Sequence, residues 1–189
     1  MPDLKPWRTL HTKLLLDCAP WLRVYSEKVE LPDGRVVNDY LRLEQPDFVM
    51  IVPVRSGCEI GLIRCYKHGV GAVDMQPPAG YIEPDEDVLV TAQRELLEET
   101  GCQAEAWFEL GSYVISGNRG TGRAHLYLAT GCQQVVEPDP GDLEEQEVIW
   151  LSLEEVQQRW TDGKFSQMAS IAALCLAFNR LGMEDIDFS

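Results

Sequence analysis

Apolar and polar residues alternate along the chain in a way that predicts short extended segments and a few helices. The β-branched run Phe48–Val54 is typical of a buried central strand, and Gly61–Tyr66 has the pattern of its antiparallel partner. Within residues 21–43, short strands are expected on either side of the turn signal Pro32–Gly34. Further strands are predicted at about Trp107–Ile115, Ala124–Ala129 and Val148–Leu151.

Three segments have the patterns of helices. A helix is predicted over about Asp85–Thr100, with acidic residues at its start. Ser152 and Glu155 form a capping box, which indicates a second helix that runs to about Arg159. Phe165–Leu181 is apolar on most faces, so we expect a last helix that packs on a sheet.

Loops of distinct composition separate these elements. Val70–Gly80 is rich in Gly and Pro, Gly117–Arg123 is flexible and basic, and Glu137–Glu147 is acidic. Strands and helices in this order favour an α/β/α sandwich with a mixed sheet over a doubly wound parallel sheet. We expect residues 1–44 to form a small N-terminal antiparallel strand region and residues 45–189 to form the main domain.

The charge balance narrows the classes of partner. The chain has 31 acidic and 16 basic residues, which gives a formal net charge of −15. Nucleic acid is not expected as a partner, because phosphate contacts on a duplex need Lys and Arg. A phosphate-containing substrate would need a positive group between itself and so acidic a protein. A divalent metal held by carboxylates is the usual solution.

Cysteine spacing and hydropathy predict a location. No two cysteines form a C-x-x-C pair, so neither a zinc framework nor a small disulfide scaffold is indicated. No stretch approaches 18 uninterrupted apolar residues, and the N-terminus lacks a long apolar region. We therefore expect a cytoplasmic protein with no membrane partner. The six cysteines are Cys18, Cys58, Cys65, Cys102, Cys132 and Cys175.

The segment Gly80–Cys102 carries the candidate chemistry. Glu95, Glu98 and Glu99 stand at positions i, i+3 and i+4, so on a helix their carboxylates share one face. Three such charges repel each other, and a hard cation such as Mg²⁺, which prefers oxygen ligands, removes that repulsion. For an isolated run of this kind, the alternative is a solvated acidic face.

The match extends well beyond the acidic run. The segment resembles the Nudix box, G-x5-E-x7-R-E-U-x-E-E-x-G-U, at every fixed position except the last, where Cys102 replaces a larger apolar residue. Nudix hydrolases cleave the diphosphate linkage of nucleoside diphosphate derivatives. The matching residues are Gly80, Glu86, Arg94, Glu95, Leu96, Glu98, Glu99 and Gly101.

The resemblance implies roles for these residues. Glu95, Glu98 and Glu99 would hold Mg²⁺, or alternatively Mn²⁺, and the carbonyl of Ala79 would also face the metal. Water would attack a phosphorus atom of the diphosphate while the metal neutralises the developing charge. The residues Gly80, Glu86, Arg94 and Gly101 would support the loop and the helix, and Gly101 would also end the helix.

A finer resemblance points to a substrate and an assembly. Gln76–Gly80 is similar to the E-x-P-A-G segment of ADP-ribose pyrophosphatases, and Leu62–Gly69 is similar to their L-x-x-Q-Y-R-x-x segment. In that subfamily the N-terminal strands form an intertwined homodimer, so residues 1–44 are the expected dimerisation element. Gln76 replaces the usual Glu and Lys67 replaces the usual Arg, which removes a planar fork for phosphate. We expect both residues to bind substrate.

Further site residues are expected on two loops. Glu98 is expected to be catalytic, and a carboxylate from the acidic loop is expected to supply the general base. Glu144 is favoured for that role, with Glu145 and Glu147 as alternatives and a merely solvated acidic loop as the competing interpretation. From the basic loop, Arg119 and Arg123 are candidates to bind substrate phosphate, unless they are ordinary surface residues.

Two other functions compete with hydrolysis of ADP-ribose or another nucleotide sugar. The first is a Nudix hydrolase of dinucleoside polyphosphates or dinucleotide cofactors. The second is a non-catalytic sensor that binds a nucleotide on the same fold. Metal-dependent release of a mononucleotide distinguishes the enzymes from the sensor.

Overall fold

The computed structural model of the chain describes residues 4–139, 141 and 145–182. The chain forms two compact units, which we describe separately. The N-terminal unit comprises Met1–Asp47 together with Val114–Arg123, and the main unit comprises Phe48–Tyr113 together with Ala124–Ser189.

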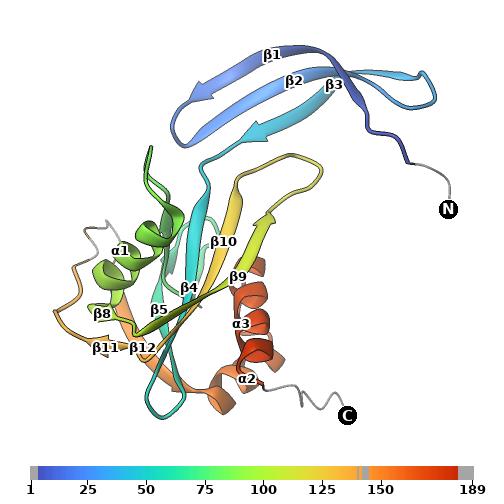
Figure 1. Cartoon of the computed structure of the whole chain (residues 1–189). Helices are drawn as coiled ribbons and strands as arrows, with labels where there is room; N and C mark the ends of the chain where they lie inside the picture. The colour runs from blue at the N-terminus through green and yellow to red at the C-terminus, as the bar shows by residue number, and fades with distance from the viewer. Residues whose placement is uncertain (1–3, 140, 142–144, 183–189) are drawn as a thin grey trace. The chain divides into compact units, whose positions relative to one another are not determined.

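The N-terminal unit contains a three-stranded antiparallel sheet, as expected for this region (Figure 1). Its strands are β1 (Arg8–Cys18), β2 (Leu22–Glu30) and β3 (Val36–Glu44). The predicted turn at residues 32–34 joins β2 to β3, and the amide of Leu31 donates to the carbonyl of Arg35 across it (2.8 Å). Strand β1 was not predicted, because all its residues are exposed and its sequence lacks the alternation that burial of one face imposes.

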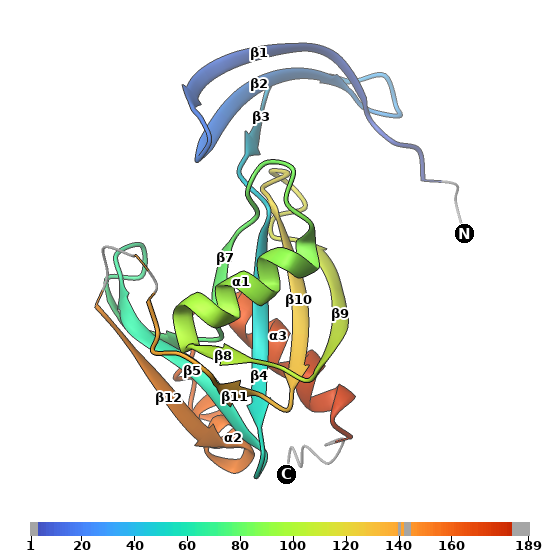
Figure 2. The same ribbon diagram turned by 60° about the vertical axis from the view of Figure 1, so that its left-hand side comes forward.

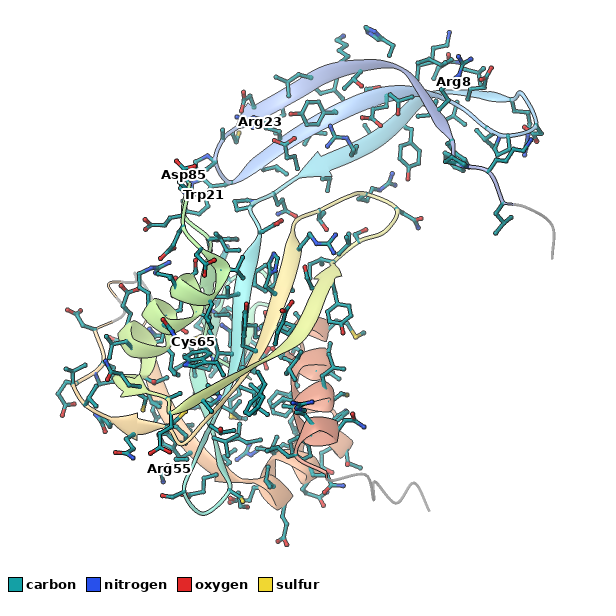
Figure 3. The ribbon with its side chains drawn as sticks, in the orientation of Figure 1. Arg8, Trp21, Arg23, Arg55, Cys65 and Asp85 are labelled. Carbon is teal, nitrogen blue, oxygen red and sulfur yellow. The ribbon has the colours of Figure 1, made fainter. Side chains whose placement is uncertain are left out.

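Ion pairs tie the strands of this sheet together. Arg42 donates to Glu27 (2.8 Å) and its guanidinium lies 4.3 Å from the centre of the Tyr25 ring. Arg8 and Arg23, which Figure 3 shows at opposite ends of the sheet, pair with Glu30 and with Asp17 respectively. Each of these pairs joins residues of neighbouring strands, so the charges reinforce the register of the sheet.

The main unit is built on a seven-stranded mixed sheet (Figure 1). The order of its principal strands is β12-β5-β4-β10-β9, in which β4 and β10 are parallel and β5 is antiparallel to both β4 and β12. Two short strands complete the sheet, β6 beside β5 and β7 beside β4. The strands are β4 (Phe48–Arg55), β5 (Glu59–Lys67), β6 (Ala72–Gln76), β7 (Ala79–Tyr81), β9 (Ala106–Val114), β10 (Arg123–Thr130) and β12 (Gln146–Ser152).

The prediction of a loop at Val70–Gly80 is wrong. Residues 72–76 pair with β5 and residues 79–81 pair with β4, so most of this segment is extended. Only the two prolines between them interrupt the pairing. Gly and Pro signal local turns, but the pairing of β6 and β7 with distant strands outweighed that local signal.

Helices cover both faces of the sheet, and the expected α/β/α sandwich with a mixed sheet is confirmed. In Figure 2, α1 lies across the near face and α3 lies behind the sheet. The apolar cluster on the α1 side includes Val49, Ile51 and Leu96, and the cluster on the α3 side includes Leu62 and Phe178. The helices are α1 (Val88–Thr100), α2 (Leu153–Thr161) and α3 (Met168–Arg180), and a small sheet pairs β8 (Cys102–Gln103) with β11 (Gln133–Gln134).

Helix boundaries differ from the expectation mainly at the N-termini. Helix α1 begins at Val88, three residues later than expected, because Asp87 is the N-cap and accepts hydrogen bonds from the amides of Leu89 and Val90. Asp85 has a left-handed φ of 65° and lies before the helix. The predicted capping box at Ser152 is confirmed. No helix among the described residues is both long enough and apolar enough to cross a membrane.

Candidate active site

Burial of one face of α1 determines where its carboxylates lie. Ala92 and Leu96 are fully buried and pack against the sheet with Val49. Because 3.6 residues make one helical turn, this packing places Glu95, Glu98 and Glu99 along the flank of the helix. The side chain of Glu95 is 13% exposed and that of Glu98 is 42% exposed.

Glu99 is held by the backbone of β7. It is buried, and its Oε2 accepts a hydrogen bond from the amide of Ala79 (2.8 Å). Pairing of β7 with β4, through Ala79 opposite Met50, fixes that amide. A hydrogen bond to a carboxylate is stronger than one between neutral groups, so the Glu99 side chain is anchored to the sheet. The predicted metal contact of the Ala79 carbonyl stays a prediction.

Arg94 is the centre of the ion-pair cluster. Its guanidinium donates to Glu86 through Nε and Nη2 (3.0 Å each), and through Nη1 to Glu95 (2.6 Å) and Glu98 (3.0 Å). The hydrogen bonds with Glu86 raise the pKa of Arg94, and Arg94 lowers the pKa of Glu86 to about 2. The supporting roles predicted for Glu86 and Arg94 therefore have a physical basis, since one guanidinium joins the loop before α1 to two carboxylates of the helix.

Gly80 allows the closest approach of β7 to α1. A Cβ atom at Gly80 would overlap the carboxyl group of Glu95. Any other residue would push this carboxylate off the strand and disturb its contact with Arg94. The requirement for glycine here is therefore one of space and not of backbone conformation.

The carboxylates fit a divalent cation by chemistry but are engaged elsewhere in this structure. Within the described ranges, no three His, Cys, Asp or Glu side chains are gathered into a group that would hold a metal ion. Arg94 contacts both Glu95 and Glu98, and Glu99 faces Ala79. The donor set is nonetheless anionic, made only of oxygen and placed on one flank of a helix, as Mg²⁺ and Mn²⁺ require. Binding would need Glu95 and Glu98 to exchange Arg94 for the cation.

A backbone segment covers the C-terminal end of α1. Gly101 ends the helix with a left-handed φ of 70°, and its carbonyl accepts hydrogen bonds from the amides of Val135 (2.8 Å) and Val136 (3.2 Å). The amide of Asp139 donates to the carbonyl of Glu98 (2.9 Å). A Cβ atom at Gly101 would overlap the carbonyl oxygen of Val136. Residues 135–139 thus satisfy the carbonyl of Glu98 in the last turn of α1 and that of Gly101, which ends the helix.

Gln76 belongs to a buried polar group that the sequence did not reveal. Its Oε1 accepts a hydrogen bond from Nε2 of Gln167 (2.8 Å), which also donates to Asp74 Oδ2 (3.3 Å). Asp74 and Gln76 are 5% and 7% exposed. Gln167 lies 91 residues from Gln76, and no local motif links the two. Lys67, the other predicted substrate residue of this region, is half-buried at the end of β5.

The remaining candidates lie elsewhere. Arg119 belongs to the N-terminal unit, where it donates to the carbonyl of Leu41 (3.2 Å). Arg123 belongs to the same unit, and its amide donates to Asp47 (2.8 Å). Glu144, the favoured general base, lies outside the described residues. Of the alternatives, Glu145 is exposed and Glu147 pairs with Arg64 (3.1 Å).

A cavity of about 430 Å³ opens along a different side of α1. It shares Arg94 with the cluster, but none of the three candidate metal ligands lines it. We therefore place the candidate site at the carboxylates and not in this cavity. The lining residues are Val90, Gln93, Arg94, Leu96, Leu97, Cys102, Gln103, Ala104 and Trp107.

Several known proteins are similar to this chain in sequence or in fold. A methanol dehydrogenase activator of Bacillus methanolicus is 30% identical over 140 residues, which are 72% of this chain and 74% of the relative. An ADP-ribose pyrophosphatase of Mycobacterium tuberculosis is 27% identical over 168 residues, which are 88% and 78% of the two chains. A crystal structure described as an ADP compounds hydrolase has the same fold, with a TM-score of 0.84 at 22% identity over 98% of this chain and 99% of that chain.

The sequence pattern of the NUDIX domain matches residues 45–170, which include both the carboxylate flank of α1 and the β7 segment that contacts it. The chain therefore belongs to the Nudix family of pyrophosphohydrolases.

Proposed function

We propose that this Nudix hydrolase cleaves the diphosphate bond of ADP-ribose or of another nucleotide sugar and releases a nucleoside monophosphate and a sugar phosphate. The observation that carries the proposal is the flank of α1, where Arg94 and the Ala79 amide hold Glu95, Glu98 and Glu99 beside β7. Such a cluster suits a phosphoryl-transfer site in which positioning and charge neutralisation supply most of the catalysis.

The residues of the chain divide the work of hydrolysis. A bound Mg²⁺ or Mn²⁺ would neutralise charge on the diphosphate oxygens. Glu95, Glu98 and Glu99 would hold it, and the Ala79 amide would keep Glu99 oriented. An oxygen of water attacks phosphorus, the bond to the bridging oxygen breaks, and a carboxylate accepts the proton of the water. We assign that carboxylate to Glu98 or to Glu144 of the acidic loop.

Two features support a nucleotide sugar as the substrate. The relatives include an ADP-ribose pyrophosphatase of Mycobacterium tuberculosis and one of Bacillus subtilis, the latter 28% identical over 133 residues. Gln76 and Lys67 stand at positions that resemble substrate-binding segments of that subfamily, and Gln76 lies three residues before Ala79. Arg119 and Arg123 complete the proposed substrate contacts. We also propose that the chain works as a homodimer assembled through residues 1–44.

The test is a product analysis on purified protein. ADP-ribose, ADP-glucose, UDP-glucose, GDP-mannose, NADH, coenzyme A and diadenosine polyphosphates are each incubated with MgCl₂, with MnCl₂ or with EDTA, and the products are separated by chromatography. We expect AMP and ribose 5-phosphate from ADP-ribose, with activity abolished by EDTA.

Each other outcome has a defined meaning. Cleavage of NADH or a diadenosine polyphosphate in preference to the nucleotide sugars would show that the proposed substrate is wrong, while the proposed diphosphatase activity would stand. Tight binding of one nucleotide without cleavage of any would overturn the enzymatic proposal and favour a sensor. Turnover that persists in EDTA would contradict the metal role of the three glutamates.

A further inference from the structure

Two buried polar side chains and one half-buried glutamine meet where β6 ends. Asp74 and Gln76 lie two residues apart on β6, and both accept hydrogen bonds from Nε2 of Gln167, which immediately precedes α3. Asp74 also accepts from the amide of Met75 (2.9 Å) through its other oxygen. Figure 3 labels Cys65, the β5 residue that pairs with Asp74. Each of the three side chains is thus tied to strand β6 or to the segment before α3.

Asp74 determines which way both amides face. An ionised aspartate only accepts hydrogen bonds, so Gln167 must direct its NH₂ group toward it. The second hydrogen of that NH₂ group then points to Gln76, which must present its oxygen. If the Gln76 amide were flipped, its NH₂ group would face the NH₂ group of Gln167. A buried donor would then lack an acceptor, which is costly in free energy. The NH₂ group of Gln76 therefore faces away from Gln167.

The NH₂ group of Gln76 is available to a ligand. Within the described part of the chain, no residue accepts a hydrogen bond from Nε2 of Gln76, although the residue is only 7% exposed. Gln76 is followed by Pro77 and Pro78 and then by Ala79, whose amide holds Glu99. At about 3.3 Å per extended residue, Gln76 lies within about 10 Å of that amide along the chain. The prolines restrict the backbone between them and keep this spacing defined.

We propose that Gln76 is a specificity residue that donates a hydrogen bond to a neutral acceptor of the substrate, a carbonyl oxygen, ring nitrogen or hydroxyl oxygen outside the diphosphate. The inference rests on the proposed function and deepens it. Asp74 makes a phosphate oxygen an unsuitable partner, because a second negative charge beside this buried carboxylate would be repelled. An ionised Glu at this position, as in the resembling motif, could only accept, so Gln76 brings a hydrogen-bond donor that the motif lacks.

The decisive variant is Gln76→Glu. Its carboxylate can still accept from Gln167, but the outward NH₂ group is lost. Because the new charge lies beside Asp74, the thermal stability of the variant is measured together with its kinetics. For the panel member that the wild type cleaves best, we expect KM to rise about 10-fold while kcat changes less than about 3-fold. The affinity for Mn²⁺, measured by electron paramagnetic resonance, should stay unchanged. The matched control is Gln103→Glu on β8, an exposed glutamine with the same change of charge, which should leave KM unchanged.

The orientation of the amide has its own test. Asp74→Asn frees Gln167 and Gln76 to turn over, so KM should rise in the same direction by a smaller factor. The side-chain NH₂ resonances of Gln76, assigned by their loss in Gln76→Glu, should shift when ADP-ribose is added to the Glu98→Gln protein, whereas those of Gln103 should not.

The outcomes separate this inference from the proposed function. An unchanged KM in Gln76→Glu, or a loss of kcat and thermal stability without a change in KM, would overturn the specificity role while the hydrolase stands. If the wild type cleaves nothing but binds ADP-ribose, a shift of the Gln76 resonances still supports the donor role. Absence of both cleavage and binding would overturn both proposals.

Discussion

Arg94 and Ala79 hold the three carboxylates of α1 in different ways. Glu99 is fixed by a backbone amide and is buried, whereas Glu95 and Glu98 share a guanidinium that is itself 27% exposed. A backbone donor cannot leave, but a side-chain cation can rotate away. Exchange of Arg94 for a divalent cation therefore requires side-chain motion at Glu95 and Glu98 only, with Glu99 as the fixed point.

Neutralising one of these carboxylates should abolish turnover and preserve the fold. We expect Glu98→Gln and Glu99→Gln each to lower kcat by about 100-fold or more, since a metal-ligand or proton-accepting oxygen loses its charge. Gln at position 99 keeps an oxygen that accepts from the Ala79 amide, so the melting temperature should change little. Steady-state kinetics and circular dichroism measure the two effects.

Glu109→Gln is the matched control for this pair. Glu109 is an exposed carboxylate on β9, and its neutralisation should leave kcat within about 2-fold of the wild type. Wild-type turnover in both Glu98→Gln and Glu99→Gln would show that the box is not the catalytic site.

The cysteines should differ sharply in reactivity. Burial raises the pKa of the Cys132 thiol to about 12, and its Sγ donates to the carbonyl of Ala129 (3.4 Å). At pH 8 we expect a thiol reagent to modify the exposed Cys18 and Cys58 and to leave Cys132 intact until the protein unfolds. Peptide mass spectrometry after alkylation, with and without urea, measures this. Modification of Cys132 in the native protein as fast as that of Cys58 would contradict the assigned burial.

The raised pKa of Cys132 also predicts a dependence of stability on pH. The unfolded thiol ionises near its ordinary pKa of 9, whereas the folded one keeps its proton until about pH 12. Between these values the unfolded state binds fewer protons, so the free energy of unfolding should fall as the pH rises from 9 to 12. Urea titrations of the wild type and of Cys132→Ala across this range measure the effect. The variant should lose less stability across this range.

Among the elements, those with strong local signals were predictable. The acidic residues at its start and Gly101 at its end located α1 to within three residues, and the capping box marked the start of α2. Strands β6 and β1 were missed for opposite reasons. Strand β6 carries loop-forming residues around it but is paired with β5 through long-range contacts. Strand β1 has no buried face, so no period-2 pattern identifies it.

Substitution of Gly101 tests how much the C-terminal end of α1 contributes to the stability of the helix that carries the site. Gly101→Ala introduces a Cβ in a left-handed conformation and against the carbonyl of Val136. We expect the free energy of unfolding to fall by about 3 kcal/mol or more. Gly163→Ala is the control, because Gly163 has φ +65° but no atom within 4 Å of the position that the new methyl group would take. Only the backbone cost of about 1–2 kcal/mol applies there.

Urea denaturation of both glycine variants gives the comparison. Equal losses at the two positions would show that the new methyl group is accommodated beside Val136 without cost. A larger loss at Gly101 would assign the difference to the tight packing of residues 135–139, which hydrogen-bond to the carbonyls of Glu98 and Gly101.

At the scale of the whole molecule, the sequence predicted the part of the site whose residues lie close together along the chain. The glutamates, Arg94 and Gly80 lie within one 23-residue motif, and their spacing on a helix already places them together. The contact of Gln76 with Gln167 spans 91 residues and depends on the packing of α3, which no motif encodes. The substrate role of Arg119, suggested by its charge on a flexible loop, stays a prediction. No motif encodes the contacts of its guanidinium with the Leu41 carbonyl and, at 5.8 Å, the Tyr40 ring.

The proposed homodimer makes a prediction about assembly and salt. Strand β1 exposes the run Leu14-Leu15-Leu16, each residue between 46% and 51% exposed, and a contiguous apolar run of this kind suits an interface. Sedimentation should give a mass twice that of the 21.3 kDa chain. Each chain has a net charge of −15, so the copies repel, and added salt should strengthen association by screening that repulsion.

Substitution on β1 tests whether these leucines form the interface. Leu15→Glu and Leu16→Glu place a charge in the apolar run and should raise the dissociation constant at least about 10-fold, because burying an unpaired carboxylate is costly. Met168→Glu, at a residue of α3 that is 78% exposed, adds the same charge outside the N-terminal unit and should leave the mass unchanged. If the wild-type protein sediments as a monomer at micromolar concentration and high salt, the proposed homodimer is wrong. A dimer unaffected by either leucine substitution would move its interface away from β1.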